Sequence, residues 1–163
     1  MISGNEALRI VNKYRERVED QSRTEALAEE FPSYAQLLGN QAVRLFRADL
    51  NKTGAFKWHG AIVGATILAK RGVRHILVPS AGNHARGSVW AGNELGLFTT
   101  AIVPTTAPPQ KSEKLWELSD DSLLTVKVIG ESFNESLEWA MQQTDGEILH
   151  PFGELVIPGQ GTM

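Results

Sequence analysis

The fold is decided by residues 75–103, which read HILVPSAGNHARGSVWAGNELGLFTTAIV. The apolar run His75–Val78 has the length of a buried strand, and Thr99–Val103 is a second run of the same kind. Residues 84–95 between them are typical of a helix and end at Gly96, which can take the left-handed conformation that closes helices. Because two parallel strands need a crossover connection, this stretch predicts a right-handed βαβ unit.

The same alternation continues toward the C-terminus. The sequence predicts helices over residues 110–118 and 134–143 and strands over residues 124–129 and 148–150. Strands that alternate with helices of about ten residues are typical of a parallel sheet with helices on both faces. We therefore expect the α/β class, with a parallel βαβ sheet of about four strands over residues 73–149 and an open strand order.

The N-terminal side follows a different pattern. Residues Asn5–Glu30 predict an amphipathic helix, residues 41–46 predict a strand, and Phe56–Arg71 predict an apolar helix that ends at Gly72. The apolar stripe of the first helix is expected to consist of Leu8, Ile10, Val11, Tyr14 and Val18.

Composition excludes several classes of function. The chain has 163 residues, a formal net charge of -3 and no cysteine. An acidic balance argues against nucleic acid and membrane surfaces as partners, and the lack of cysteine excludes a disulfide scaffold or thiolate catalysis. The chain has no cysteine that could complete a ligand set with its four histidines, so no metal site is expected. The N-terminal residues resemble no signal peptide, and we expect a cytoplasmic protein.

A first candidate site is the run Ser80, Ala81, Gly82, Asn83, His84 and Ala85 between a predicted strand and a predicted helix. Free backbone N–H groups converge at the N-terminus of such a helix and can bind an anion. The alternative is a tight strand-to-helix turn in which Asn83 acts as N-cap.

A second candidate is Lys57, which opens the apolar helix after the turn at Gly54. An amine that is partly removed from water there binds its proton less tightly and becomes a usable nucleophile. The alternative is an ordinary surface lysine whose stem lies along apolar neighbours.

Together, these segments resemble the threonine dehydratase and serine racemase branch of the fold-type-II pyridoxal-phosphate enzymes. The resemblance runs from about Leu37 to Thr162 and rests on TGAFK (53–57) with Gly60-Ala61, SAGNHA (80–85), HPF (150–152) and GQGT (159–162). It implies a tryptophan-synthase-beta-like fold, pyridoxal 5'-phosphate as cofactor, a small amino-acid substrate and a homo-oligomer.

The resemblance also implies residue roles. Lys57 matches the lysine that binds the cofactor covalently and moves the Cα proton, and Phe56 matches the aromatic neighbour of the cofactor ring. Asn83 matches the asparagine that hydrogen-bonds the pyridine 3-oxygen. The loop that binds the substrate carboxylate corresponds to Ser80, Ala81, Gly82, Asn83 and His84.

Three residues that differ from the family pattern bear on which activity is expected. Ala55 and His59 stand where the family often has serine and arginine, and Ala81 stands where the similar racemases have a serine as second acid/base. Since an aliphatic side chain cannot move a proton, the resemblance favours dehydration and deamination of L-threonine or L-serine over racemisation. A non-catalytic domain and another fold-type-II activity (racemase, other ammonia lyase or β-replacement) stay open as alternatives.

Members of this family are considerably longer than this chain. We therefore expect the N-terminal part of a large domain over residues 1–72, a small α/β domain over residues 73–149, and a truncated return to the large domain over residues 150–163. Because the family's phosphate-binding loop lies beyond the matched part, we expect the isolated chain to be inactive and to bind the cofactor weakly at best.

Overall fold

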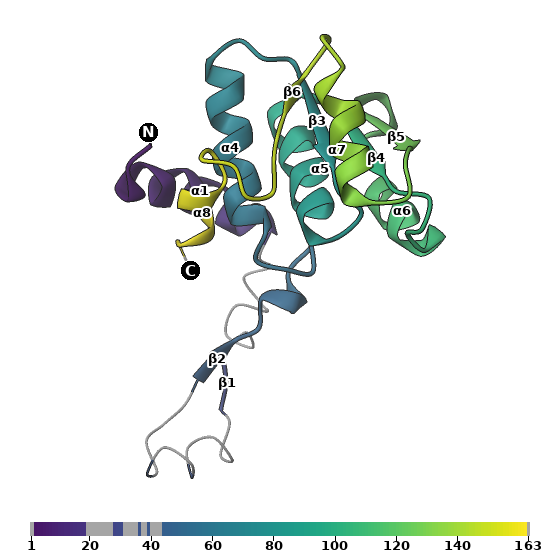
Figure 1. The fold of residues 1–163 in the computed structure, drawn as a ribbon. Helices are drawn as coiled ribbons and strands as arrows, with labels where there is room; N and C mark the ends of the chain where they lie inside the picture. Colours follow the sequence, from purple (N-terminus) through teal and green to yellow (C-terminus); the bar gives the residue numbers. More distant parts are fainter. Residues whose placement is uncertain (1, 19–27, 31–35, 37–38, 40–43, 163) are drawn as a thin grey trace.

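A computed structural model describes residues 2–18, 28–30, 36, 39 and 44–162 of the chain. Most of its elements are arranged around one four-stranded sheet, and Ala28–Glu30 and Arg44–Phe46 form a separate two-stranded sheet that stands apart from it (Figure 1). In chain order they are α1 (Gly4–Val18), β1 (Ala28–Glu30), β2 (Arg44–Phe46), η2 (Ala48–Leu50), α4 (Trp58–Lys70), β3 (His75–Pro79), α5 (Asn83–Leu95), β4 (Phe98–Val103), α6 (Pro109–Trp116), η3 (Asp121–Leu123), β5 (Leu124–Val128), α7 (Phe133–Met141), β6 (Glu147–Ile148) and α8 (Ile157–Gln160).

The central sheet has four strands in the order β5-β4-β3-β6. Each pair of neighbours is parallel, with Ile76 opposite Thr99 between β3 and β4 and Leu77 opposite Ile148 between β3 and β6. This confirms the α/β class and the parallel sheet predicted from the alternation of strands and helices. The observed bounds of these strands and helices differ from the predicted bounds by at most two residues.

Helices cover both faces of this sheet, as predicted. Successive side chains of a strand point to opposite faces, so Ile76 and Val78 lie in the core shared with α5 and α6. Leu77 points the other way and packs with Ile102 of β4 and with Ala140 of α7.

The predicted N-terminal helix is too long. Helix α1 ends at Val18, and Ala28–Glu30 is a strand that pairs antiparallel with Arg44–Phe46. Within the described residues, the buried stripe of α1 consists of Ala7, Ile10, Val11, Tyr14 and Val18. Leu8, which the sequence pattern assigns to that stripe, is 41% exposed.

The strand predicted over residues 41–46 is confirmed for Arg44–Phe46, and residues 41–43 lie outside the described residues. The predicted helix Phe56–Arg71 begins two residues later, at Trp58, and its last turn is followed by Gly72 with a φ of 88°. A positive φ at this point explains why a glycine closes the helix.

Helices α4 and α5 lie side by side and begin at the same end of the molecule, where β3 and β4 also end (Figure 1). The two helices touch through Gly87, since a Cβ added there would lie 2.8 Å from the Trp58 nitrogen. This close contact places the start of α5 beside the start of α4, and thereby the two candidate segments beside each other.

Candidate functional site

Lys57 is the residue that immediately precedes α4, and its side chain is half-buried. Its Nζ donates a hydrogen bond to Gln160 Oε1 at 3.1 Å, and it lies 5.2 Å from the ring centroids of both Phe56 and Phe152. In the described part of the chain, no carboxylate pairs with this amine. Lys57 is therefore held by a neutral oxygen and two aromatic rings, which leaves its nitrogen free for covalent chemistry after loss of a proton.

The turn before Lys57 is held by its own polar side chains. Asn51 is 7% exposed, and its Nδ2 donates to the carbonyl oxygens of Ala48 at 2.7 Å and Ala55 at 3.0 Å. Asn51 Oδ1 accepts the Thr53 backbone N–H at 2.9 Å. These bonds fold the chain back on itself just ahead of Phe56 and fix the direction in which α4 begins.

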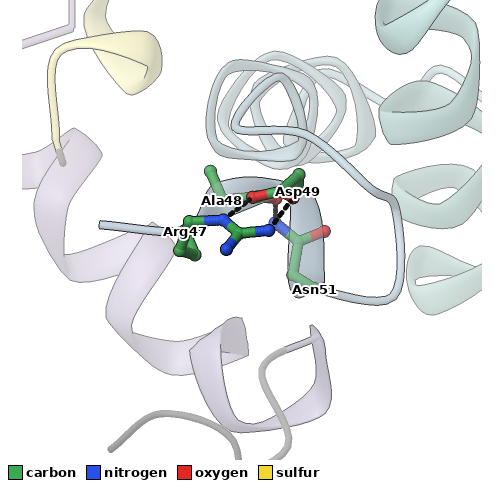
Figure 2. A network of polar contacts seen from close by, with 4 residues as sticks. All are labelled: Arg47, Ala48, Asp49 and Asn51. Carbon is green, nitrogen blue, oxygen red and sulfur yellow. Dashed lines mark hydrogen bonds and ion pairs between the residues drawn. The ribbon is translucent and has the colours of Figure 1, made fainter. Parts of the chain in front are cut away.

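Figure 2 shows the outer part of the same turn. The Arg47 guanidinium donates from Nε and from one Nη to the two oxygens of Asp49, at 2.8 and 2.7 Å. This hydrogen bonding holds the pKa of Asp49 below its usual value. The pair and the Asn51 bonds together fix both ends of η2.

The SAGNHA segment forms the connection from β3 to α5. Gly82 is the N-cap, and Asn83 is the first helical residue, so the alternative of Asn83 as a side-chain N-cap is wrong. The Gly82 N–H donates to Ser80 Oγ at 3.3 Å, and Ser80 and Ala81 are half-buried. The next N–H groups lie in the first helical turn and have no partner within the helix, so an anion can bind there.

Asn83 lies on the face of α5 that meets Lys57. It precedes Gly87 by four residues, which in a helix places both on one side, and Gly87 touches the backbone of Lys57 and Trp58. The Asn83 side chain is exposed and makes no hydrogen bond within the described residues. Its amide is therefore available to a ligand that lies between the start of α5 and the lysine.

His84 is buried, with 3% exposure, and its Nε2 lies 2.7 Å from the Leu149 carbonyl oxygen. Burial is the main cause that lowers the pKa of His84 to about 4, and the nearby Lys57 and His150 act in the same direction. His84 is therefore a neutral ring at ordinary pH. The structure places it beneath the loop of residues 80–83 and away from open solvent.

Aromatic rings line the site from α7 to the lysine. The ring of Phe133 lies 5.9 Å from that of His150, which in turn lies 6.1 Å from that of Phe152. Phe152 is 67% exposed and reaches Lys57 Nζ. Phe152 and Gln160 belong to sequence motifs, but the sequence predicts no role for either residue. A motif does not show which of its side chains contacts the lysine.

The residues present fit pyridoxal phosphate. An aldehyde needs a primary amine, and Lys57 has one. A planar ring needs an apolar neighbour, which the Phe56 ring beside Lys57 could provide. A ring hydroxyl needs a donor, and the exposed Asn83 amide has one. A Cβ at Gly82 would meet nothing within 4 Å, so there is open space in front of this loop.

Other candidate sites are absent from the described residues or lie elsewhere. No three His, Cys, Asp or Glu side chains gather as metal ligands there, and none of the helices described is long and apolar enough to cross a bilayer. A cavity of about 590 Å³ lies between α1 and the second half of α4, lined by residues that include Arg9, Lys13 and Thr66. Lys57 is not among the residues that line this cavity.

Comparison with known proteins gives consistent matches. The family profile described as "Pyridoxal-phosphate dependent enzyme" matches residues 5–163. The biosynthetic L-threonine dehydratase of Lactococcus lactis is 34% identical over 126 residues, which cover 74% of this chain and 30% of that protein. The L-threonine ammonia-lyase of Thermotoga maritima is 35% identical over 120 residues and 71% of this chain, and 29% of its own length is covered.

Solved structures agree with these relatives. The processed form of threonine deaminase isoform 2 from Solanum lycopersicum is 25% identical with a TM-score of 0.69, and the match covers 99% of this chain and 44% of that one. Serine racemase from Dictyostelium discoideum, at 24% identity and a TM-score of 0.77, shares the fold, with 98% of this chain and 49% of that one covered. The chain thus spans about a third of the curated relatives' length, and slightly under half of these structures.

Proposed function

Because this chain belongs to the family of pyridoxal-phosphate-dependent enzymes of fold type II, we propose that it is the lysine-bearing part of an ammonia-lyase that converts L-threonine or L-serine into a 2-oxo acid and ammonia. The observation that carries the proposal is the juxtaposition of the Lys57 amine with the first turn of α5. Relatives named threonine dehydratase and threonine ammonia-lyase support this substrate class.

The residues divide the work as follows. The backbone N–H groups at the start of α5 bind the substrate carboxylate, and the positive end of the helix dipole favours its charge. When bound, the cofactor withdraws electrons from Cα. Lys57 Nζ then takes the Cα proton and returns a proton to the β-hydroxyl, which leaves as water. Hydrolysis of the resulting imine by one water releases ammonia and the 2-oxo acid. Before Lys57 takes the Cα proton, its amine donates a hydrogen bond to Gln160 Oε1, which holds the amine in place.

Ala81 favours elimination over racemisation. Racemisation needs an acid/base group on each side of Cα, and the methyl group of Ala81 supplies none where similar racemases have a serine. A second candidate function is a domain that keeps the fold without catalysis.

We also propose the domain division stated above. Residues 1–72 and 150–163 form parts of the large domain, and residues 73–149 form the small domain. Contacts among α1, α4 and α8 and a four-stranded sheet drawn wholly from residues 75–148 support this division, and the contact between α4 and α5 joins the two domains. Assembly as a homo-oligomer is a further prediction, which light scattering during size-exclusion chromatography tests.

Covalent mapping tests the lysine. The purified chain is mixed with pyridoxal phosphate, reduced with borohydride and digested, and the labelled peptide is identified by mass. We expect label at Lys57, its loss in Lys57→Ala, and no change in the control Lys52→Ala, which alters an exposed lysine of the same turn. Equal labelling of several lysines would contradict a special role for Lys57.

A titration tests the activity. We expect the chain alone to bind pyridoxal phosphate weakly and to release no 2-oxobutanoate from L-threonine, because the cofactor phosphate needs an array of backbone donors outside the matched part. Stoichiometric binding with turnover would show that the site is complete in this chain, alone or in its assembled form, and would overturn the prediction of an inactive fragment.

A further inference from the structure

We infer that His84 is a positioning residue, whose neutral ring ties the substrate-binding turn of α5 to the peptide that leaves β6 and, through it, to Lys57. The inference rests on the proposed function, since it takes the start of α5 as the place where the substrate carboxylate binds. His84 itself touches no reacting atom in this scheme.

The hydrogen bond determines which nitrogen of the neutral ring carries the proton. A carbonyl oxygen only accepts, so the 2.7 Å contact between His84 Nε2 and Leu149 O requires the proton on Nε2. Nδ1 then carries a lone pair, and it is buried without a hydrogen-bond partner in the described part of the chain. Ser88 Oγ lies 3.4 Å from the same Nε2, so the 2.7 Å contact with the carbonyl is the shorter of the two.

The peptide that accepts this bond is held from both sides. The Leu149 N–H donates to Leu77 O of β3 at 2.9 Å, and the Leu149 carbonyl accepts from His84. Leu149 is 1% exposed. His84 thus continues the hydrogen bonding of the β3–β6 pair onto helix α5, one residue beyond the end of the strand.

From Leu149 a short path of contacts reaches the lysine. Two residues later, the Pro151 carbonyl accepts a hydrogen bond from Gln160 Nε2 at 3.1 Å. The oxygen of the same Gln160 amide accepts from Lys57 Nζ at 3.1 Å. Pro151 is buried, so its carbonyl is fixed, and displacement of the Leu149 peptide moves the group that holds the lysine amine.

The electrostatic surroundings suit a neutral donor. The charged or titratable groups that act on His84 are Lys57 and His150, and both disfavour a positive charge on its ring. A lysine or arginine at position 84 would place an additional cation among them. The position therefore selects a buried neutral side chain with an N–H donor.

Three variants separate positioning from packing. His84→Gln keeps an N–H donor, His84→Leu keeps much of the volume without a donor, and His75→Gln changes a half-buried histidine at the opposite end of β3 as a control. The readout is the rate at which pyridoxal phosphate and borohydride label Lys57, with circular dichroism and a thermal melt as checks of folding.

We expect His84→Leu to label Lys57 about 5- to 10-fold more slowly, the effect of losing one buried hydrogen bond, while His84→Gln regains most of the rate and His75→Gln matches the wild type. Equal labelling rates for the wild type and a folded His84→Leu would overturn the positioning role of His84 and leave the lysine assignment intact. Failure of the wild type to label at Lys57 would instead refute the proposed function.

A spectroscopic measurement covers the case in which His84→Leu does not fold. Nitrogen-15 NMR of the wild-type histidine rings is expected to show His84 as the Nε2–H tautomer, with its proton protected from exchange with water. An Nδ1–H tautomer, or rapid exchange of the Nε2 proton, would contradict the inference whatever the variants do.

Discussion

The two faces of the four-stranded sheet are covered to different depths. On one face α5 and α6 pack on the strands, α4 packs on α5, and α1 packs on α4, so that one continuous core reaches from Leu124 to Ala7. On the other face, α7 contributes to a small core whose buried members among the described residues are Leu77, Ile102 and Ala140.

This difference decides how firmly each part of the site is held. Lys57 and the first turn of α5 belong to the deep side, where Gly87 lets the helix touch the backbone of the lysine. Phe133 begins α7 on the shallow side, and its ring lies 5.9 Å from the ring of His150. We expect α7 to open more readily than α4 and α5, because less apolar surface holds it.

The largest effect is expected where the deep side is tightest. Gly87→Val places a side chain against backbone atoms of Trp58, with the first carbon already 2.8 Å from its nitrogen, so the two helices have to separate. We expect a loss of about 3 kcal/mol in the free energy of unfolding, measured in urea. In the control Gly4→Ala the new Cβ meets nothing within 4 Å, and a comparable loss there would show that any added methyl destabilises this protein.

The second-largest effect is expected at low pH, where the deep side of the sheet becomes less stable. Burial is the main cause that lowers the pKa of His59 to about 4, and Arg15 adds to it. The unfolded chain binds a proton at this residue near pH 6.5, so stability falls as the pH drops below about 6.5 and until it passes about 4. Between pH 7 and pH 5, we expect the free energy of unfolding to fall by about 2 kcal/mol more in the wild type than in His59→Phe.

Urea titrations of both proteins at the two pH values measure this difference. His84, also with a pKa lowered to about 4, stays in both proteins and gives the remaining acid dependence. An equal loss of unfolding free energy in the wild type and the variant would mean that His59 is protonated in the folded chain. Water would then reach His59 although its side chain is 0% exposed.

The smallest effect is expected on the shallow side. Ala140→Gly removes a buried methyl from α7 and costs about 1 kcal/mol through helix propensity. Because α7 is expected to open on its own, hydrogen exchange should accelerate in α7 and hardly change in α5. The matched change Ala91→Gly in α5 should accelerate exchange throughout the described core. Acceleration in α5 by Ala140→Gly would show that the two faces unfold together.

The sheet could be predicted from the sequence because its signals are local. Apolar runs of strand length alternate with helices that end at glycine, and each strand and helix from His75 to Ile148 lies within two residues of its predicted bounds. The predicted N-terminal helix is too long because charged, helix-favouring residues continue past Val18, and only the partner strand Arg44–Phe46 shows that Ala28–Glu30 is extended.

The candidate site divides in the same way. The sequence alone determined that an α/β chain carries a lysine after a glycine turn and a small-residue loop before a helix, because side-chain type and spacing along the chain suffice for both inferences. Only the tertiary structure decided that Gln160 holds the lysine and that His84 binds Leu149, since these partners are 103 and 65 residues apart in the chain. Contacts of that range depend on how α4, α5 and α8 pack, and the close approach that glycines such as Gly87 permit is a property of the packed backbone.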